Sequence, residues 1–152
     1  NIQKPLQVKN ARTEYSILRP NLFVPLLRTL KNNTDVEYPQ NLFEIGKIFK
    51  DSAESETEIE EKERLLASFS PGNFTSAKQT LDYIMRMLNL EYTIAEAHQE
   101  GLIEGRTALI MINGKPAGHL GEVHPATLHN WRLKMPLSII ELDLDELYKH
   151  LM

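Results

Sequence analysis

Residues 14–50 read EYSILRPNLFVPLLRTLKNNTDVEYPQNLFEIGKIFK, and this stretch decides the fold. Its first half carries an apolar stripe at helical spacing, made of Leu22, Phe23, Leu26, Leu27 and Leu30. The stripe predicts a helix over residues 21–31, with the Asn21 side chain capping its first turn. A helix this apolar must bury its stripe against a sheet, another helix or another subunit. By default such a stripe belongs to the core of its own domain.

The second half of the stretch predicts a strand over residues 42–50. Its apolar residues are Leu42, Phe43, Ile45, Ile48 and Phe49. A strand that is apolar at most positions is typical of the centre of a sheet, where both faces are covered. The next residues, 51–64, carry seven acids and two bases and predict a solvated loop. Residues 64–70 (RLLASFS) predict the antiparallel return strand.

The rest of the chain predicts elements in hairpin pairs. The expected strands cover residues 6–9, 92–95, 107–112, 115–123 and 136–142, and residues 101–105 are expected to form a turn. The expected helices cover residues 75–88, 125–131 and 144–152, and Thr75 or Ser76 is expected to cap the first of them. Asn113-Gly114 is the strongest hairpin signal. Strands in hairpin pairs predict an α+β fold, an antiparallel sheet of about six strands flanked by helices.

Composition limits the possible functions. The 152 residues suit a single domain, and 41% hydrophobic with 25% charged residues is ordinary for a globular protein. No apolar run approaches the ~20 residues of a membrane span, and the lack of cysteine fits a cytoplasmic protein. Residues 51–64 sum to −5 of the net charge of −4, which leaves about +1 for the remainder. The chain therefore has no basic patch fit to hold nucleic acid alone.

Two patterns resemble known sites only superficially. His119, His124 and His129 are five residues apart, which does not match the spacing of a helical metal pair. The glycine-rich residues 114–121 (GKPAGHLG) lack the order of a phosphate-binding loop and indicate a hairpin instead.

The charged residues are better candidates for a functional site. Glu141 and Asp143 are two apart, so in a strand they share a face and could meet a cation or an amine. Asp143 and Asp145 could equally introduce the last helix, where acids suit the helix dipole. Arg12 and Arg19 could contact phosphate or form ion pairs. These residues alone describe a packed domain without an assembled active site.

Several segments together resemble the β subunit of phenylalanyl-tRNA synthetase. They are residues 10–22 (NARTEYSILRPNL) with Pro25-Leu26-Leu27, Leu42–Phe49 (LFEIGKIF), Gly114 with 117–125 (AGHLGEVHP), and 141–144 (ELDL). The resemblance covers nearly the whole chain, and we expect one catalytic-like domain over residues 1–152, cut from a longer β subunit. It departs at Pro20-Asn21 and at Val24-Pro25-Leu26, which lacks the family's glycine after proline.

The resemblance implies a class II aminoacyl-tRNA synthetase-like fold and a non-catalytic role. In this family the α subunit carries out ATP-dependent ligation of phenylalanine to tRNA(Phe), and the β module packs against it in a cytoplasmic (αβ)2 heterotetramer. Residues 42–46 (LFEIG) lack the ATP-binding arginine of active class II domains, and 141–147 (ELDLDEL) lack their glycine and arginine. We therefore expect no cofactor in this domain, although the parent complex uses ATP and Mg²⁺, and tRNA is reached through the complex.

Three functions remain open. The assembly hypothesis places Leu22, Leu26, Leu30, Arg12 and Arg19 at the interface with the α subunit. The enzyme hypothesis is an independently active synthetase-like domain whose phosphate contacts come from Arg12, Arg19 and Arg106. A stand-alone binding module is the third possibility.

Overall fold

The computed structural model describes residues 6–7, 16–33, 35–52 and 58–151. Its elements, in chain order, are α1 (Phe23–Asn32), β1 (Gln40–Asp51), β2 (Ile59–Ser70), α2 (Phe74–Met87), β3 (Thr93–Glu96), β4 (Leu102–Ile112), β5 (Lys115–Val123), α3 (Pro125–Trp131), β6 (Ser138–Asp143) and α4 (Leu144–Leu151). The six strands form one sheet in the order β1-β2-β6-β5-β4-β3, and all neighbours are antiparallel. The predicted α+β architecture is confirmed.

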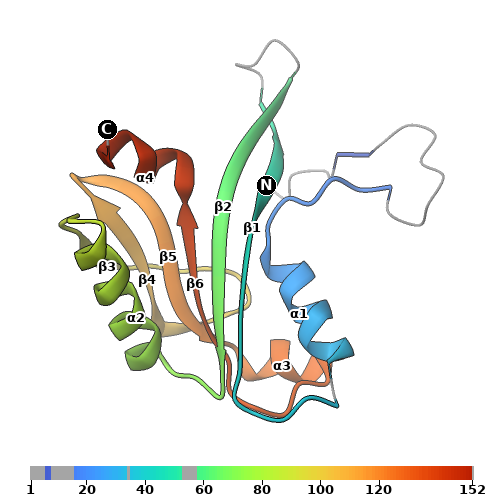
Figure 1. Cartoon of the computed structure of the whole chain (residues 1–152). Helices are drawn as coiled ribbons and strands as arrows, with labels where there is room; N and C mark the ends of the chain where they lie inside the picture. Colours follow the sequence, from blue (N-terminus) through green and yellow to red (C-terminus); the bar gives the residue numbers. More distant parts are fainter. Residues whose placement is uncertain (1–5, 8–15, 34, 53–57, 152) are drawn as a thin grey trace.

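Helices cover both faces of this sheet (Figure 1). On one face α2 and α4 pack on the central strands, with Leu81, Met85 and Leu147 in the core cluster. On the other face α1 and α3 pack over β2 and β6, with Leu22 and Leu66 both fully buried. Strand β6 is buried along its whole length because it lies between the two layers.

The helix α1 lies where its apolar stripe predicts, although it begins two residues later and ends one residue later than predicted. The Asn21 side chain accepts a hydrogen bond from the Val24 amide at 3.1 Å, so it serves the first turn as expected, although the helix begins after Leu22. Leu22, Leu26 and Leu30 are 0%, 4% and 5% exposed. The stripe is therefore buried against this chain's own sheet.

Strand β1 lies at the edge of the sheet, so the expectation of a central strand is wrong. Its residues alternate, and Ile48 faces α1 while Phe43 and Ile45 point to the opposite face. Phe43 is 77% exposed and Ile45 is 52% exposed. An apolar run looks the same in sequence whether both faces are covered or one is open, because strand order is a property of the whole sheet.

Other differences concern strand and helix ends. Strand β1 continues to Asp51 and strand β2 already begins at Ile59, so part of the predicted solvated loop is paired strand. Lys47 of β1 and Glu61 of β2 form a cross-strand ion pair at 2.8 Å. The predicted turn at 101–105 is confirmed only at Gly101, because β4 already begins at Leu102 and passes the remaining residues with a shift in register. Asn73, not Thr75 or Ser76, caps α2; Ser76 completes the capping box.

The N-terminal strand and the closing helix are described in part. Gln7 forms an isolated bridge with Ile17, and the Leu18 amide donates to the Leu6 carbonyl at 2.9 Å; residues 8 and 9 of that predicted strand, and Met152 of the last helix, lie outside the described residues. The hairpin at Asn113-Gly114 and the helix Pro125–Trp131 are confirmed. None of the described helices has the length and apolar character needed to cross a membrane.

Candidate functional site

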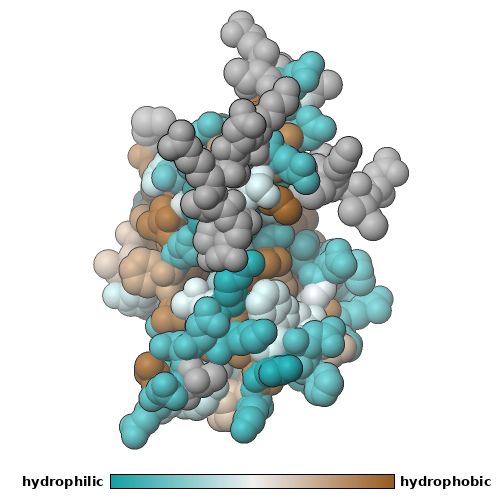
Figure 2. Space-filling model, turned by 90° about the vertical axis from the view of Figure 1, so that its right-hand side faces the viewer, coloured by the Kyte–Doolittle hydropathy of each residue, from teal (hydrophilic) through white to brown (hydrophobic). Residues whose placement is uncertain are grey.

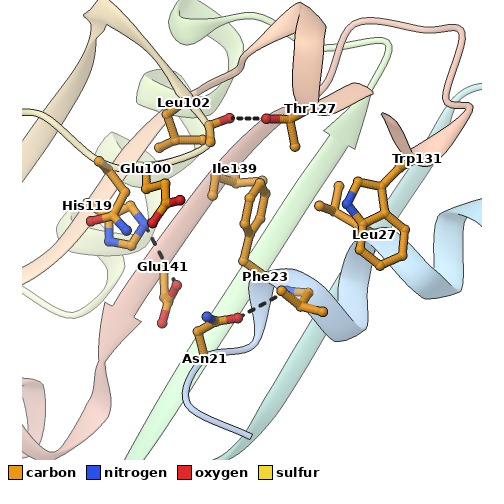
Figure 3. Close-up of a pocket in the computed structure, with 13 residues that line it drawn as sticks. Asn21, Phe23, Leu27, Glu100, Leu102, His119, Thr127, Trp131, Ile139 and Glu141 are labelled. Carbon is orange, nitrogen blue, oxygen red and sulfur yellow. Dashed lines mark hydrogen bonds and ion pairs between the residues drawn. The ribbon is translucent and has the colours of Figure 1, made fainter. Parts of the chain in front are cut away.

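The sheet face that carries α1 and α3 is hollowed over its centre. Two adjoining cavities, of about 380 and 540 Å³, share Asn21, Gln99, His119 and Glu141 among their lining residues. We call the two together the sheet-face groove. Figure 3 shows the smaller cavity, with His119 and Glu141 at one end and Phe23, Leu27 and Trp131 towards the other.

His119 and Glu141 are the buried polar pair at the centre of the sheet-face groove. They are direct cross-strand neighbours on β5 and β6, and His119 Nε2 lies 3.7 Å from Glu141 Oε2. Their side chains are 18% and 6% exposed. Burial, with a smaller contribution from the Arg64 charge, lowers the pKa of His119 to about 4. Burial raises the pKa of Glu141, and the positive charges of Arg64 and Lys50 oppose that rise.

Arg64 and Asp143 form a second buried pair in the adjoining cavity. They face each other across β2 and β6 at 3.1 Å, with side chains 14% and 12% exposed. Asp143 Oδ1 also accepts from the Glu146 amide at 3.1 Å, and Asp145 accepts from the Glu63 amide at 3.0 Å. The prediction that these two aspartates introduce the last helix is confirmed, and Asp143 additionally neutralises Arg64.

Arg19 is fixed on strand β1. Its guanidinium forms an ion pair with Glu44, and its Nε donates to the Lys47 carbonyl at 2.7 Å. The Arg19 carbonyl accepts from the Phe49 amide at 3.0 Å. Gly46 leaves room for the guanidinium, since a Cβ there would lie 2.0 Å from Arg19 Nη2.

The other predicted interface residues are placed differently. Leu22, Leu26 and Leu30 are buried inside the chain, so they hold α1 on the sheet and present no surface of their own. Arg12 lies outside the described residues. A role for these residues in subunit assembly stays a prediction.

The three histidines and the glycine-rich segment singled out in the sequence lie within strands, helices and turns of the fold. His119 is buried in the sheet, whereas His124 caps α3 by accepting from the Ala126 amide at 3.1 Å, and His129 is exposed within that helix. Among the described residues, no group of three or more His, Asp and Glu side chains could hold a metal ion. Residues 114–121 form the β4–β5 turn and the first part of β5.

Acidification is expected to destabilise the fold through His119. The folded pKa of about 4 lies below the ordinary 6.5, so the unfolded chain binds more protons between these values and stability falls as pH drops through that window. At about 1.4 kcal/mol per unit, the loss approaches roughly 3 kcal/mol. Urea unfolding of the wild type and His119→Gln across this window measures the effect. The variant should lose clearly less stability, and equal losses would contradict the assignment.

Sequence reasoning missed most of the sheet-face groove. It singled out Glu141 with Asp143 but paired neither with Arg64, and for His119 it found only a spacing that does not match a helical metal pair. Arg64 and Asp143 lie far apart in the sequence, and the order of the strands in the sheet brings them together. An i, i+2 pair of acids on a predicted buried strand was the available signal, because buried charges need partners.

The fold defines a class of protein structure. The arrangement is that of class II aminoacyl-tRNA synthetases: pyrrolysyl-tRNA synthetase from Desulfitobacterium hafniense superposes with a TM-score of 0.69, covering 87% of this chain and 49% of that chain at 15% identity. At that identity the likeness concerns the fold alone. Residues 2–144 match the model of the phenylalanyl tRNA synthetase beta chain CLM domain, and the chain belongs to this family.

Curated relatives agree with the family. The phenylalanine–tRNA ligase beta subunit of Thermococcus kodakarensis is 40% identical over 149 residues, which are 97% of this chain and 25% of that protein. The corresponding subunit of Pyrococcus abyssi is 39% identical over 137 residues, 89% of this chain and 25% of that protein. The chain thus spans about a quarter of the length of these relatives.

Proposed function

We propose that this chain is a non-catalytic module of a phenylalanine–tRNA ligase β subunit and that it supports assembly with the catalytic α subunit. In the assembled (αβ)2 complex, the α subunit ligates phenylalanine to tRNA(Phe) with ATP and Mg²⁺ in the cytoplasm. The family and the relatives support the parent complex. The assembly role is supported by the exposed apolar side chains of edge strand β1.

The exposure of Phe43 and Ile45 is the observation that carries this proposal. They lie two residues apart on the same face of β1, and they are 77% and 52% exposed. Their cross-strand neighbours on β2, Ala67 and Leu65, extend the apolar surface towards the helix layer of α2. A contiguous apolar surface at the edge of a sheet is typical of a protein interface, since aromatic anchors contribute much of the binding energy there.

The outer side of α1 offers a second contact surface. Ile17 and Val24 are 51% and 41% exposed, and both line an apolar cavity of about 590 Å³ between α1 and the segment before it. Figure 2 shows this side of the molecule, where apolar residues lie in separate spots among hydrophilic ones. The helix can therefore contribute to an interface through its exposed side rather than through its buried leucines.

The positions and ion pairs of the candidate arginines weaken the alternative of an independently active enzyme. Arg19 is paired with Glu44 on β1, and Arg106 is paired with Glu122 at 2.7 Å on the β4–β5 side of the sheet. Three strands, β2, β6 and β5, separate β1 from β4, so these two arginines do not converge on one phosphate group. The third candidate, Arg12, lies outside the described residues.

Two of the three lysine and arginine side chains that line the sheet-face groove are already paired. Arg64 is paired with Asp143, although its Nε has no hydrogen-bond partner among the described residues, and Lys62 is paired with Glu60 at 3.2 Å; Lys50 is the third. Glu141 lies between the two cavities and would repel an anion. An oxyanion needs uncompensated donors for its charge, which supports the proposal that ATP is bound by the α subunit and not by this domain.

Replacing Phe43 by aspartate tests the assembly role. Phe43→Asp should reduce assembly with the α subunit of the same organism by tenfold or more, because a hot-spot aromatic commonly contributes about 2 kcal/mol or more. Light scattering of the co-purified subunits measures the complex. Thermal unfolding of the isolated chain should hardly change, since Phe43 is 77% exposed.

Met87→Asp is the matched control for this variant. Met87 is 67% exposed at the end of α2, away from β1, so its replacement should leave assembly intact. If Phe43→Asp assembles as the wild type does, the β1 surface is not the contact. Pyrophosphate exchange by the isolated chain would instead favour the enzyme alternative.

A further inference from the structure

The C-terminal ends of α1 and α3 meet at one corner of the molecule (Figure 1). Lys31 lies in the last turn of α1, and its Nζ lies 5.9 Å from the centre of the ring of Trp131, the last residue of α3. Arg132 ends α3 in the left-handed backbone conformation, with φ of 60°, and Lys134 follows two residues later. Lys31, Arg132 and Lys134 are all exposed, and we call these three residues the corner cluster.

The corner cluster differs from most of the other described cations because it has no carboxylate partners. The paired cations are Arg19, Lys47, Lys62, Arg64, Lys78, Arg106 and Lys149. Within the described part of the chain, none of the three corner residues forms an ion pair. Asp35 and Glu37 are the acids closest to Lys31 along the chain, and neither of them pairs with it. The corner therefore carries uncompensated positive charge.

The helix dipole explains only part of this arrangement. Cations near a helix C-terminus are stabilised by the partial negative charge of the helix end. That reason covers Lys31 and Arg132, whereas Lys134 lies past the end of its helix. The surroundings are hydrophilic, since His129 and Asn130 are exposed and Figure 2 shows hydrophilic residues over most of the lower part of the side that carries α1. The positive charge is thus presented to a partner rather than used within the fold.

The composition of this surface favours RNA over an acidic protein segment. Lysine is depleted in protein–protein interfaces, whereas nucleic-acid interfaces are polar and rich in positive charge. Residues 129–134 include no exposed large apolar side chain that could anchor a protein, since Trp131 and Leu133 are both half-buried. A phosphate backbone presents repeated negative charges, which neighbouring lysine and arginine side chains neutralise together.

We propose that the corner cluster contacts the phosphate backbone of RNA through Lys31, Arg132 and Lys134. The choice of RNA rests on the proposed function, in which the assembled complex acts on tRNA(Phe). Three cations do not hold RNA alone at physiological salt, so this contact adds to those of the rest of the complex. The corner cluster lies on the α1 face of the sheet, whereas the exposed side chains of Phe43 and Ile45 point to the opposite face.

The test is an NMR titration of the full chain with a transcript of tRNA(Phe) at about 50 mM salt, where phosphate contacts are strong. We expect saturable shifts at the backbone amides of Lys31, Arg132 and Lys134, with a dissociation constant of about 100 μM or tighter. Raising the salt to about 200 mM should weaken binding roughly 40-fold, because three duplex phosphates give a logarithmic salt slope near −2.7. Binding that is insensitive to salt, or no saturable shift at these amides, would overturn the proposal.

Arg132→Gln/Lys134→Gln should bring the salt slope to about −0.9, the value for one remaining contact. Arg86→Gln/Lys115→Gln is the matched control, because it removes one exposed arginine and one exposed lysine that also have no ion pair among the described residues. Lys115 begins β5, whereas α3 follows the other end of that strand. The control should keep the wild-type slope. Equal losses by the two double variants would show that only net charge matters and would refute the assignment.

Polyglutamate of similar length, titrated in parallel, separates RNA from an acidic protein segment. If it shifts the same amides with the affinity of the tRNA, the corner cluster recognises an acidic chain and the RNA assignment is wrong. The titration needs no α subunit, so a failure of the chain to assemble would contradict the proposed function and leave the RNA result standing. Conversely, normal assembly without RNA shifts would overturn this contact alone.

Discussion

Leu26→Asp is expected to leave the chain largely unfolded, with a loss of more than about 4 kcal/mol of free energy of unfolding. Leu26 is 4% exposed and packs in the cluster between α1 and the sheet. An aspartate there would place an unpaired carboxylate in an apolar layer, which is among the few changes that cost so much. Circular dichroism during thermal unfolding measures the effect.

Two further substitutions calibrate this result. Leu26→Ala removes the side chain without adding a charge and should cost about 2–5 kcal/mol. Val24→Asp introduces the same charge on the exposed side of α1, where Val24 is 41% exposed, and should cost within about 0.5 kcal/mol. A folded Leu26→Asp variant with wild-type stability would show that α1 does not pack as described.

The Leu26 result also bears on subunit assembly. A failure of Leu26→Asp to assemble would follow from unfolding alone, because the side chain is covered by its own domain. Only variants at exposed positions separate a lost contact from a lost fold. The interface is therefore better tested at Phe43 and Val24 than at the buried leucines.

Arg64→Met is expected to cost about 3–5 kcal/mol of free energy of unfolding. The change leaves the Asp143 carboxylate, 12% exposed, without its partner at 3.1 Å. Removing one member of a buried ion pair strands the other charge, which costs far more than the pair itself contributes. Urea unfolding monitored by Trp131 fluorescence measures the loss.

The double variant Arg64→Met/Asp143→Asn is the control. Asparagine keeps the oxygen that accepts from the Glu146 amide at the start of α4 but carries no charge. The double variant should therefore recover most of the stability lost by Arg64→Met. If the two variants are equally unstable, the loss comes from packing of the Arg64 side chain and not from the stranded carboxylate.

Locally encoded elements could be predicted from the sequence. The helix α1 follows from leucines at helical spacing, and the β4–β5 hairpin follows from Asn113-Gly114, because the residues that decide each element lie within it. The α+β class followed from strands arranged in hairpin pairs. The resemblance of residues such as Leu42–Phe49 to the β-subunit family is confirmed by the match over residues 2–144.

Features that depend on strand order could not be predicted in the same way. Phe43 is exposed because β1 lies at the edge of the sheet, and the residues of β1 alone do not indicate that position. The pairing of Arg64 with Asp143 requires β2 and β6 to be neighbours although 79 positions separate the two residues. The groove combines residues from α1, α3, β5 and β6, so the buried position of Glu141 beside His119 becomes visible only after these elements are packed together.

The way Arg19 is fixed on β1 has a consequence for solubility. An open sheet edge is a template on which identical chains can add strands and grow into fibrils. Arg19 already occupies the hydrogen-bonding groups of Lys47 and Phe49 on that edge, so a second strand could not run along its full length. Aggregation by edge-to-edge growth is thereby obstructed at one end, while the end that carries Phe43 stays accessible to a partner shaped for it.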